Sequence, residues 1–172
     1  NDKRFVETYF KDFKSALIYS TFDWGIKDHE GYYFILGRTD DVINVAGHRI
    51  GTREIEEALQ SHQNVAEVAV VGVEDSLKGQ IPVAFIVLKK YEFSAAKSQL
   101  DQEADTIAKS VADKLGAIAR PKKIYFVNML PKTRSGKLLR RSIQALAEGR
   151  QPGDLSTLED PSALEEIAKI LS

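Results

Sequence analysis

The stretch that decides the fold is VAEVAVVGVEDSLKGQIPVAFIVL, which runs from residue 65 to residue 88. Its two halves, 65–73 and 81–88, are rich in β-branched residues and are separated by a polar loop, so each is predicted to be a strand. A helix is predicted before them, with Thr52 as its N-cap, and a long amphipathic helix is predicted after them over residues 100–115. Neighbouring strands between two amphipathic helices predict a sheet that is covered by helices.

The rest of the chain adds shorter elements to this core. We predict strands at 42–45 and 124–127, a helix over 138–147, and a short helix at the end of the segment 151–172. The fold class is therefore α+β, a small domain with a short mixed sheet flanked by helices. We place this domain at residues 40–150 and treat 151–172 as a C-terminal tail.

Residues 1–39 do not have the pattern of a complete domain. A helix is predicted over 3–14 and strands at 17–20 and 32–36, with Asp23-Trp24-Gly25 as turn residues between the strands. These are interpreted as the last elements of a larger N-terminal domain. The chain begins with Asn rather than Met, so we expect it to be cut from a longer protein.

The composition excludes several classes of protein. The chain has 24 Lys+Arg against 25 Asp+Glu, a net charge of -1, which excludes a globally basic nucleic-acid-binding protein. The absence of Cys excludes disulfides and thiolate metal sites, and the three His show no metal-ligand spacing, so no metal site is predicted. No apolar run approaches about 18 residues, so neither a membrane span nor a membrane partner is predicted.

A basic loop is the first candidate site. PKTRSGKLLRR, residues 131–141, carries five positive charges and no acidic residue. Backbone N–H groups at the start of a helix, together with a lysine, suit a phosphate group. The loop resembles the end of a P-loop, but Pro131 and Leu138 stand where that motif requires Gly and Ser or Thr. From charge alone, a solvated basic helix start is an equally good interpretation.

Two earlier segments could also carry chemistry. GRTDDVINVAGHRIG, residues 37–51, holds two Arg, two Asp and three Gly. Arg can bind a phosphate or ribose and Gly permits close backbone approach, but a charged turn with weak surface ion pairs explains the segment slightly better. In residues 20–32, an Asp beside aromatic residues could bind a ribose diol or could cap a turn.

Taken together, the motifs resemble the C-terminal portion of the AMP-forming acyl-CoA synthetases, which belong to the adenylate-forming superfamily. The resemblance runs through DxxxxDxxGY at 23–32, GRTDDVINVAGHRIGTREIE at 37–56 and LPKTRSGK at 130–137, in the order and spacing of the family. Short-chain acetyl- and propionyl-CoA synthetases look most similar. The variants at 20–25 and 148–157 resemble the propionyl-CoA synthetases.

This resemblance implies a two-step ligase reaction. A carboxylate and MgATP give an acyl-adenylate and pyrophosphate, and the CoA thiol then attacks the adenylate to give acyl-CoA and AMP. Lys137 is implied to be the catalytic residue, which reaches the carboxylate and the α-phosphate during adenylation. Asp23 is implied to hold the ribose hydroxyls, Arg38 to lie beside ribose and phosphate, and Arg49 to contact the nucleotide phosphate.

The resemblance also implies that the small domain rotates between the two steps. Asp40 matches the family's hinge position, and Gly47 is implied to line the tunnel for the pantetheine of CoA. Ala112 stands where some family members have an Arg that contacts the CoA nucleotide. Lys109 and Lys114 lie nearby in the sequence, and no role is assigned to them.

The implied substrates are ATP, CoA and a short-chain carboxylate such as propionate or acetate. Mg²⁺ is expected to accompany ATP on ligands from the missing N-terminal domain, which is the implied partner of this chain. Family members are regulated by acylation of the lysine at the Lys137 position, which implies a lysine acetyltransferase and a deacylase as further partners. The expected location is cytoplasmic, and the chain alone is expected to be inactive.

Two other interpretations of the sequence stay open. The chain could be a stand-alone binding module whose patch Lys132–Arg141 binds nucleic acid or an acidic partner, and salt-dependent binding to generic DNA or RNA would favour it. It could also belong to another adenylate-forming enzyme, such as a carrier-protein ligase. CoA-dependent turnover would distinguish that enzyme from a CoA ligase.

Overall fold

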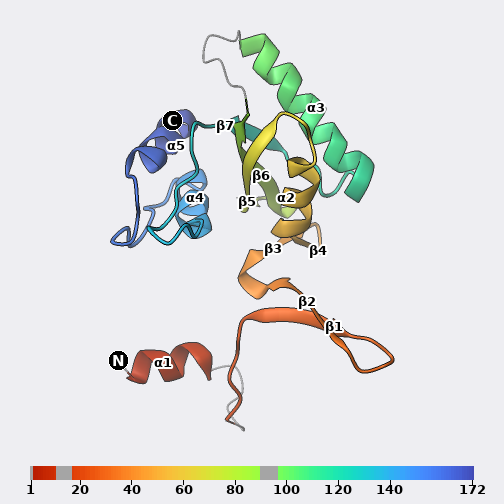
Figure 1. Cartoon of the computed structure of the whole chain (residues 1–172), viewed down its shortest axis with the longest axis vertical. Helices are drawn as coiled ribbons and strands as arrows, with labels where there is room; N and C mark the ends of the chain where they lie inside the picture. Colours follow the sequence, from red (N-terminus) through yellow and green to blue (C-terminus); the bar gives the residue numbers. More distant parts are fainter. Residues whose placement is uncertain (1, 11–16, 90–96) are drawn as a thin grey trace. The chain divides into compact units, whose positions relative to one another are not determined.

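The computed structural model describes residues 2–10, 17–89 and 97–172 (Figure 1). The chain divides into two compact units, Asn1–Val42 and Ile43–Ser172. The division falls three residues after the boundary that we predicted between 39 and 40. Each unit is described by itself.

The first unit contains a helix and a β-hairpin. Its elements are α1 (Asp2–Tyr9), β1 (Asp23–Lys27), β2 (Tyr33–Arg38) and the 3-10 turn η1 (Thr39–Asp41). The strand predicted at 17–20 is wrong, because these residues form no ladder, and Asp23-Trp24-Gly25 begins β1 instead of a turn. Gly25 allows this pairing, since a Cβ there would lie 2.4 Å from the carbonyl oxygen of Phe34 on the opposite strand. Part of the helix predicted over 3–14 lies outside the described residues.

The turn between β1 and β2 is capped by an aspartate. The Asp28 carboxylate accepts hydrogen bonds from the backbone N–H groups of Glu30 (3.0 Å) and Tyr32 (2.9 Å). The backbone of Gly31 adopts a φ of +96°, a left-handed conformation that favours glycine. Of the two roles left open for an Asp in this segment, the structure gives Asp28 the turn-capping one.

The second unit is built on a mixed five-stranded sheet. Its strands are β3 (Val42–Val45), β4 (His48–Gly51), β5 (Val65–Asp75), β6 (Gly79–Leu88) and β7 (Lys123–Phe126). The strands run in the order β4-β3-β6-β5, and β7 pairs with β6 in parallel beside β3. The long hairpin β5–β6 is in register from Glu67 opposite Val87 to Asp75 opposite Gly79. The strands predicted in this region are confirmed.

Helices cover both faces of this sheet. The helices α2 (Thr52–Gln60) and α3 (Lys97–Leu115) lie on one side, whereas α4 (Arg140–Ala147) and α5 (Ser162–Leu171) lie on the other (Figure 1). The predicted N-cap is wrong: Gly51 precedes the helix, and Thr52 is its first residue, because β4 continues as far as Gly51.

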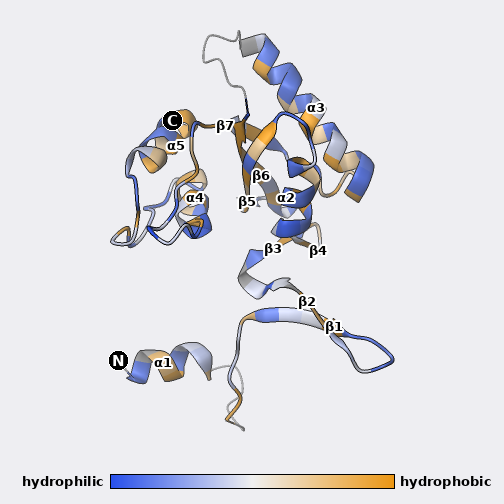
Figure 2. Ribbon diagram, viewed as in Figure 1, coloured by the Kyte–Doolittle hydropathy of each residue, from blue (hydrophilic) through white to orange (hydrophobic). Residues whose placement is uncertain are grey.

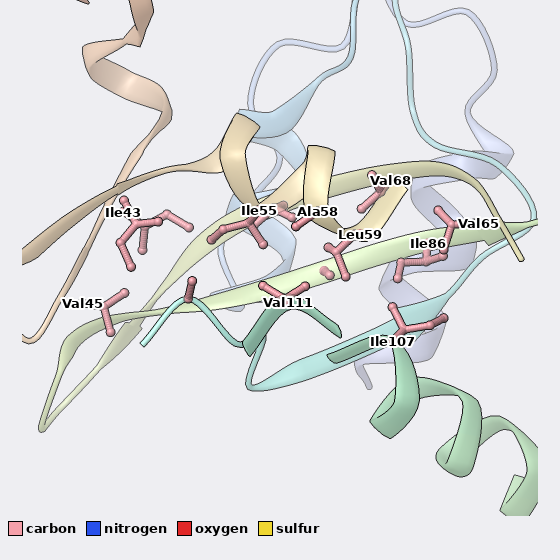
Figure 3. Close-up of a cluster of buried hydrophobic side chains, with 14 residues drawn as sticks. Ile43, Val45, Ile55, Ala58, Leu59, Val65, Val68, Ile86, Ile107 and Val111 are labelled. Carbon is pink, nitrogen blue, oxygen red and sulfur yellow. The ribbon is translucent and has the colours of Figure 1, made fainter. Parts of the chain in front are cut away.

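The strands carry continuous apolar runs because both of their faces are buried. In β5, Val68 and Val70 point into the cluster beneath α2 and α3, whereas Ala69 and Val71 point into the cluster beneath α4 and α5. Figure 3 shows the first cluster, where side chains from β3, α2, β5, β6 and α3 point toward one another. Figure 2 shows apolar residues gathered on the strands and polar residues on the outer sides of the helices.

Candidate functional site

Lys137 lies at the end of a tight hairpin formed by Pro131–Leu139. The backbone N–H of Thr133 donates to the carbonyl of Lys137 (2.8 Å), and that of Leu139 donates to the carbonyl of Pro131 (3.0 Å). The loop between the arms is Arg134-Ser135-Gly136, and Gly136 has a φ of +79°. A three-residue hairpin loop that ends with a left-handed residue needs glycine at this position.

The side chains around the loop hold the backbone of Lys137 and leave its ammonium group unengaged. The Thr133 Oγ1 accepts a hydrogen bond from the backbone N–H of Lys137 at 3.0 Å and lies 3.0 Å from the Ser135 Oγ. The Lys137 side chain is exposed, and within the described ranges it forms no ion pair. The Thr and Ser of the motif therefore shape the loop, while the lysine stays available for an external anion.

Two ion pairs anchor this hairpin to the rest of the unit. Lys132 lies 2.7 Å from a carboxylate oxygen of Glu67 on β5. Arg140, the first residue of α4, donates from Nε (3.2 Å) and from a terminal nitrogen (2.7 Å) to the two carboxylate oxygens of Glu56 on α2. The Glu56 carboxylate also accepts the backbone N–H of Val70 at 2.9 Å. These acids neutralise two of the five cations in the patch Lys132–Arg141, which weakens its interpretation as a nucleic-acid surface.

A second hairpin carries two further candidates. Ala46 and Gly47 connect β3 to β4, with φ values of +50° and +87°, which is the pattern of a two-residue type I′ turn. Gly47 is exposed, and a Cβ added there would meet no atom within 4 Å. Arg49 lies on β4, is exposed, and makes no ion pair within the described part of the chain. The turn thus gives a conformational reason for glycine at this position.

The first unit brings Asp23 and Arg38 together. They are directly opposite each other in the antiparallel ladder of β1 and β2. The Asp23 side chain is exposed, and its backbone N–H donates to the Thr21 Oγ1 at 3.3 Å. An acidic and a basic residue thus lie side by side at one end of the hairpin.

Asp40 lies near the end of the first unit, whose last residue is Val42. Its backbone belongs to η1, which is flanked by extended residues, Arg38 with φ and ψ of -91° and 148° and Val42 with -101° and 130°. A single short turn between extended residues can absorb a change in backbone dihedrals without breaking a longer element.

The second unit separates Lys137 from Gly47 and Arg49. The hairpin of Lys137 is attached to β5 through the Lys132–Glu67 pair, whereas Gly47 and Arg49 belong to the β3–β4 hairpin on the other side of β6. The candidates of this unit therefore occupy two places on its surface instead of one pocket.

The sequence did not predict the ion pair between Glu56 and Arg140 that helps to anchor the hairpin. Glu56 matched only the preference of a helix start for acidic residues, and its partner Arg140 is 84 positions away in the sequence. No local signal links the two residues.

The geometry does not indicate a ligand-binding role for the residues of α3 that the sequence analysis named. On α3, Ala112 is half-buried, Lys109 is exposed, and the Lys114 ammonium donates to the Ser61 hydroxyl. Among the described residues, no three His, Asp or Glu side chains are grouped so that they could hold a metal ion. No helix in the described ranges is long and apolar enough to cross a membrane.

Comparison with known proteins identifies relatives of the whole chain. The sequence model of the AMP-binding enzyme C-terminal domain matches residues 54–137. The propionate–CoA ligase of Salmonella typhimurium is 56% identical over 99% of this chain and 27% of its own length. The acetyl-coenzyme A synthetase of Pyrobaculum aerophilum is 48% identical over 97% of this chain and 24% of its own length. The chain thus spans about a quarter of the length of these curated relatives.

Solved structures show the same fold. The crystal structure of the ATP-bound RpMatB-BxBclM chimera B1 matches with a TM-score of 0.68 and 31% identity, over 82% of this chain and 27% of that one. The similarity confirms the predicted small α+β domain.

Proposed function

Since this chain belongs, through residues 54–137, to the AMP-binding enzyme C-terminal domain family, we propose that it is the mobile C-terminal part of a short-chain acyl-CoA ligase. The proposed reaction joins propionate or acetate to CoA through an acyl-adenylate, with release of pyrophosphate and AMP. The 56% identity to a propionate–CoA ligase over nearly the whole chain is the single observation that carries this proposal.

In the proposed adenylation step, Lys137 brings two anions together. The carboxylate oxygen attacks the α-phosphorus of ATP and pyrophosphate leaves, while the ammonium group faces the charge that develops on the phosphate oxygens. At about 4 Å and an effective dielectric constant of about 20, one such contact is worth about 4 kcal/mol before desolvation is subtracted. The Lys137 side chain is exposed and forms no ion pair within the described residues, and both observations support this role. Acetylation of Lys137 removes the charge and is expected to abolish this step.

Three residues are proposed to contact the nucleotide. Asp23 accepts hydrogen bonds from the ribose hydroxyls, and Arg38 lies opposite it beside ribose and phosphate. Arg49 contacts the nucleotide phosphate in the adenylation state, and Mg²⁺ enters as part of the MgATP substrate. Asp23 and Arg49 are exposed, which is consistent with residues that bind a ligand from solution.

The separation of the two hairpins supports a change of orientation between the steps. The Pro131–Leu139 hairpin presents Lys137 during adenylation, and the β3–β4 hairpin presents Gly47 beside the pantetheine of CoA during thioester formation. Asp40 is the proposed hinge, because it lies in a short turn at the end of the first unit, just before the second unit begins.

The first unit is proposed to be the end of the larger adenylating domain. On its hairpin, Tyr33 is 73% exposed and Ile35 is 69% exposed, which leaves more apolar surface uncovered than a stable folded unit usually shows. The acyl and adenine pockets are proposed to lie in that larger domain. We therefore expect the 172-residue chain by itself to form no acyl-CoA.

The test uses the full-length protein that carries this chain, with Lys137→Ala and the control Arg134→Ala, which removes an exposed cation from the same loop. Acyl-dependent ATP–pyrophosphate exchange with propionate and acetate measures adenylation, and CoA transfer from supplied acyl-adenylate measures the second step. We expect the Lys137→Ala variant to lose ATP–pyrophosphate exchange and to retain CoA transfer. The control Arg134→Ala should retain both activities.

Other results would contradict the proposal. Equal losses in both variants would attribute the effect to the net charge of the loop instead of Lys137. Full exchange in Lys137→Ala would exclude a role for this lysine in adenylation. Adenylation without any CoA-dependent turnover in the unmodified protein would favour a carrier-protein ligase.

A further inference from the structure

The tail that follows α4 pairs with the hairpin of Lys137. The backbone N–H of Arg134 donates to the carbonyl of Thr157 (3.2 Å), and the N–H of Glu159 donates to the carbonyl of Lys132 (2.9 Å). These two bonds make Thr133 and Leu158 antiparallel bridge partners, while Lys132 bridges Leu138 on its other side. The arm 131–134 is therefore the middle of three short antiparallel segments, and the tail supplies the third.

The tail is itself fixed to the core. Leu158 is 7% exposed, and on α5 the side chains of Leu164 and Ile167 are buried. The Glu166 carboxylate of α5 accepts hydrogen bonds from the Asn128 side-chain amide (2.7 Å) and backbone N–H (3.1 Å). Because Asn128 lies just before the hairpin, α5 also holds the chain that leads into it.

This arrangement matters because the tail supplies backbone hydrogen bonds along the outer edge of the arm 131–134. Two strands alone are marginally stable in water, and a third strand with a buried side is needed for a persistent geometry. The Lys137 side chain has no ion pair within the described residues, so its position is set by the backbone that carries it. The match to the family's sequence model ends at Lys137 itself, before the tail begins.

We propose that residues 155–171, the tail clamp, are a positioning element that holds the Lys137 hairpin in the geometry required for adenylation. This inference rests on the proposed function of Lys137. The clamp touches neither substrate nor reacting atoms. It acts by keeping the backbone of the hairpin in place, and misplacing a catalytic group by about 1 Å can cost about 100-fold in rate.

A positioning role predicts a selective effect. Loosening the clamp should lower the rate of acyl-dependent pyrophosphate exchange and leave the KM for ATP nearly unchanged, because the backbone hydrogen bonds of the clamp go to the Lys137 hairpin. CoA transfer from supplied acyl-adenylate should also be unchanged, because Lys137 is not required in that step. If the variant only lowered the fraction of folded protein, the rates of both half-reactions would fall by the same factor.

The first experiment uses Glu159→Pro in the full-length protein. Proline removes the N–H that donates to Lys132, and the matched control Glu159→Ala retains it. We expect exchange to fall on the order of 10- to 100-fold in the proline variant, with transfer within about twofold of the unmodified protein. The alanine variant should keep both activities.

A second variant covers the case in which the proline disturbs folding. Glu166→Ala removes the bonds to Asn128 without touching the bridge, and Glu165→Ala changes the exposed neighbour on the same helix as a control. We expect a smaller loss of exchange, on the order of severalfold, in Glu166→Ala only.

The outcomes separate this inference from the proposed function. If Lys137→Ala abolishes exchange while Glu159→Pro and Glu166→Ala keep it, the tail clamp has no positioning role and the function of Lys137 stands. If both half-reactions fall equally in the clamp variants, the tail only stabilises the fold, and the inference is wrong. If Lys137→Ala keeps exchange, the proposed function itself fails.

Discussion

The ion pair between Glu56 and Arg140 should make a large contribution to the stability of the second unit. The Glu56 side chain is 12% exposed and that of Arg140 is 32% exposed, so the pair is largely shielded from water. The Glu56 carboxylate also accepts the backbone N–H of the fully buried Val70 on β5. Because β5 is the edge strand of the described sheet, no further strand of that sheet can accept this N–H. Glu56→Ala therefore removes an ion-pair partner and a backbone acceptor in one change.

The magnitude follows from these two losses. Removing one partner of a buried pair costs about 3–5 kcal/mol, and the partial exposure of Arg140 places this contact at or below the lower end. A buried N–H that loses its acceptor costs about 1–3 kcal/mol, but the two terms share one carboxylate and do not add fully. We expect Glu56→Ala to lower the free energy of unfolding by about 3 kcal/mol.

The measurement is urea denaturation of the 172-residue chain, followed by far-ultraviolet circular dichroism, because the single tryptophan lies in the first unit. At an m-value of about 2 kcal/mol per molar urea, the midpoint should fall by about 1.5 M. The control is Glu57→Ala, which breaks the exposed pair with Arg53 on the same helix and should cost about 0.5 kcal/mol or less. Equal effects of the two substitutions would refute this account of the Glu56–Arg140 pair.

Three further changes test other parts of the structure in the same assay. Gly47→Ala should cost about 1–2 kcal/mol because its φ is +87°, whereas Gly51→Ala, at a φ of -69°, should introduce no such strain. Hydrogen bonds from the N–H groups of Lys78 and Leu77 lower the pKa of Asp75 below 3.8, so Asp75→Ala should be less stable than the unmodified chain at pH 6, and the difference should shrink as the pH falls below about 4. A constant difference down to pH 2 would contradict that assignment. Lys137→Ala should change stability by less than about 0.5 kcal/mol, because the side chain is exposed, and a larger loss would mean that it supports the fold.

Most of the fold of the second unit could be predicted because its signals are local. The apolar runs 65–73 and 81–88 lie in β5 and β6, and the helical periodicity of 100–115 lies in α3. The first unit was harder, since β1 begins with Asp-Trp-Gly, residues typical of turns. Its pairing depends on a backbone approach at Gly25 that has no signature in the sequence.

The resemblance to the family proposes the candidate residues Lys137, Asp23, Arg38, Arg49, Asp40 and Gly47, and their roles stay predictions. Their arrangement in space was not predicted. The structure adds that Asp23 and Arg38 face each other, and that Gly47 lies in a turn whose positive φ favours glycine. It also adds that Lys132 and Arg140 of the basic patch are paired with acids. A charge count in the sequence cannot distinguish a paired cation from an available one.

The sequence by itself determined which segments form strands and helices in the second unit, because these depend on residues a few positions apart. It also determined which side chains carry charged or hydrogen-bonding groups. Only the tertiary structure decided which cations stay available and what holds Lys137. Glu56 meets Arg140 across 84 positions, and the tail at Leu158 meets Thr133 across the whole of α4. Such contacts form only when the helices on both faces of the sheet bury their apolar sides, and that packing brings distant polar groups within hydrogen-bonding distance.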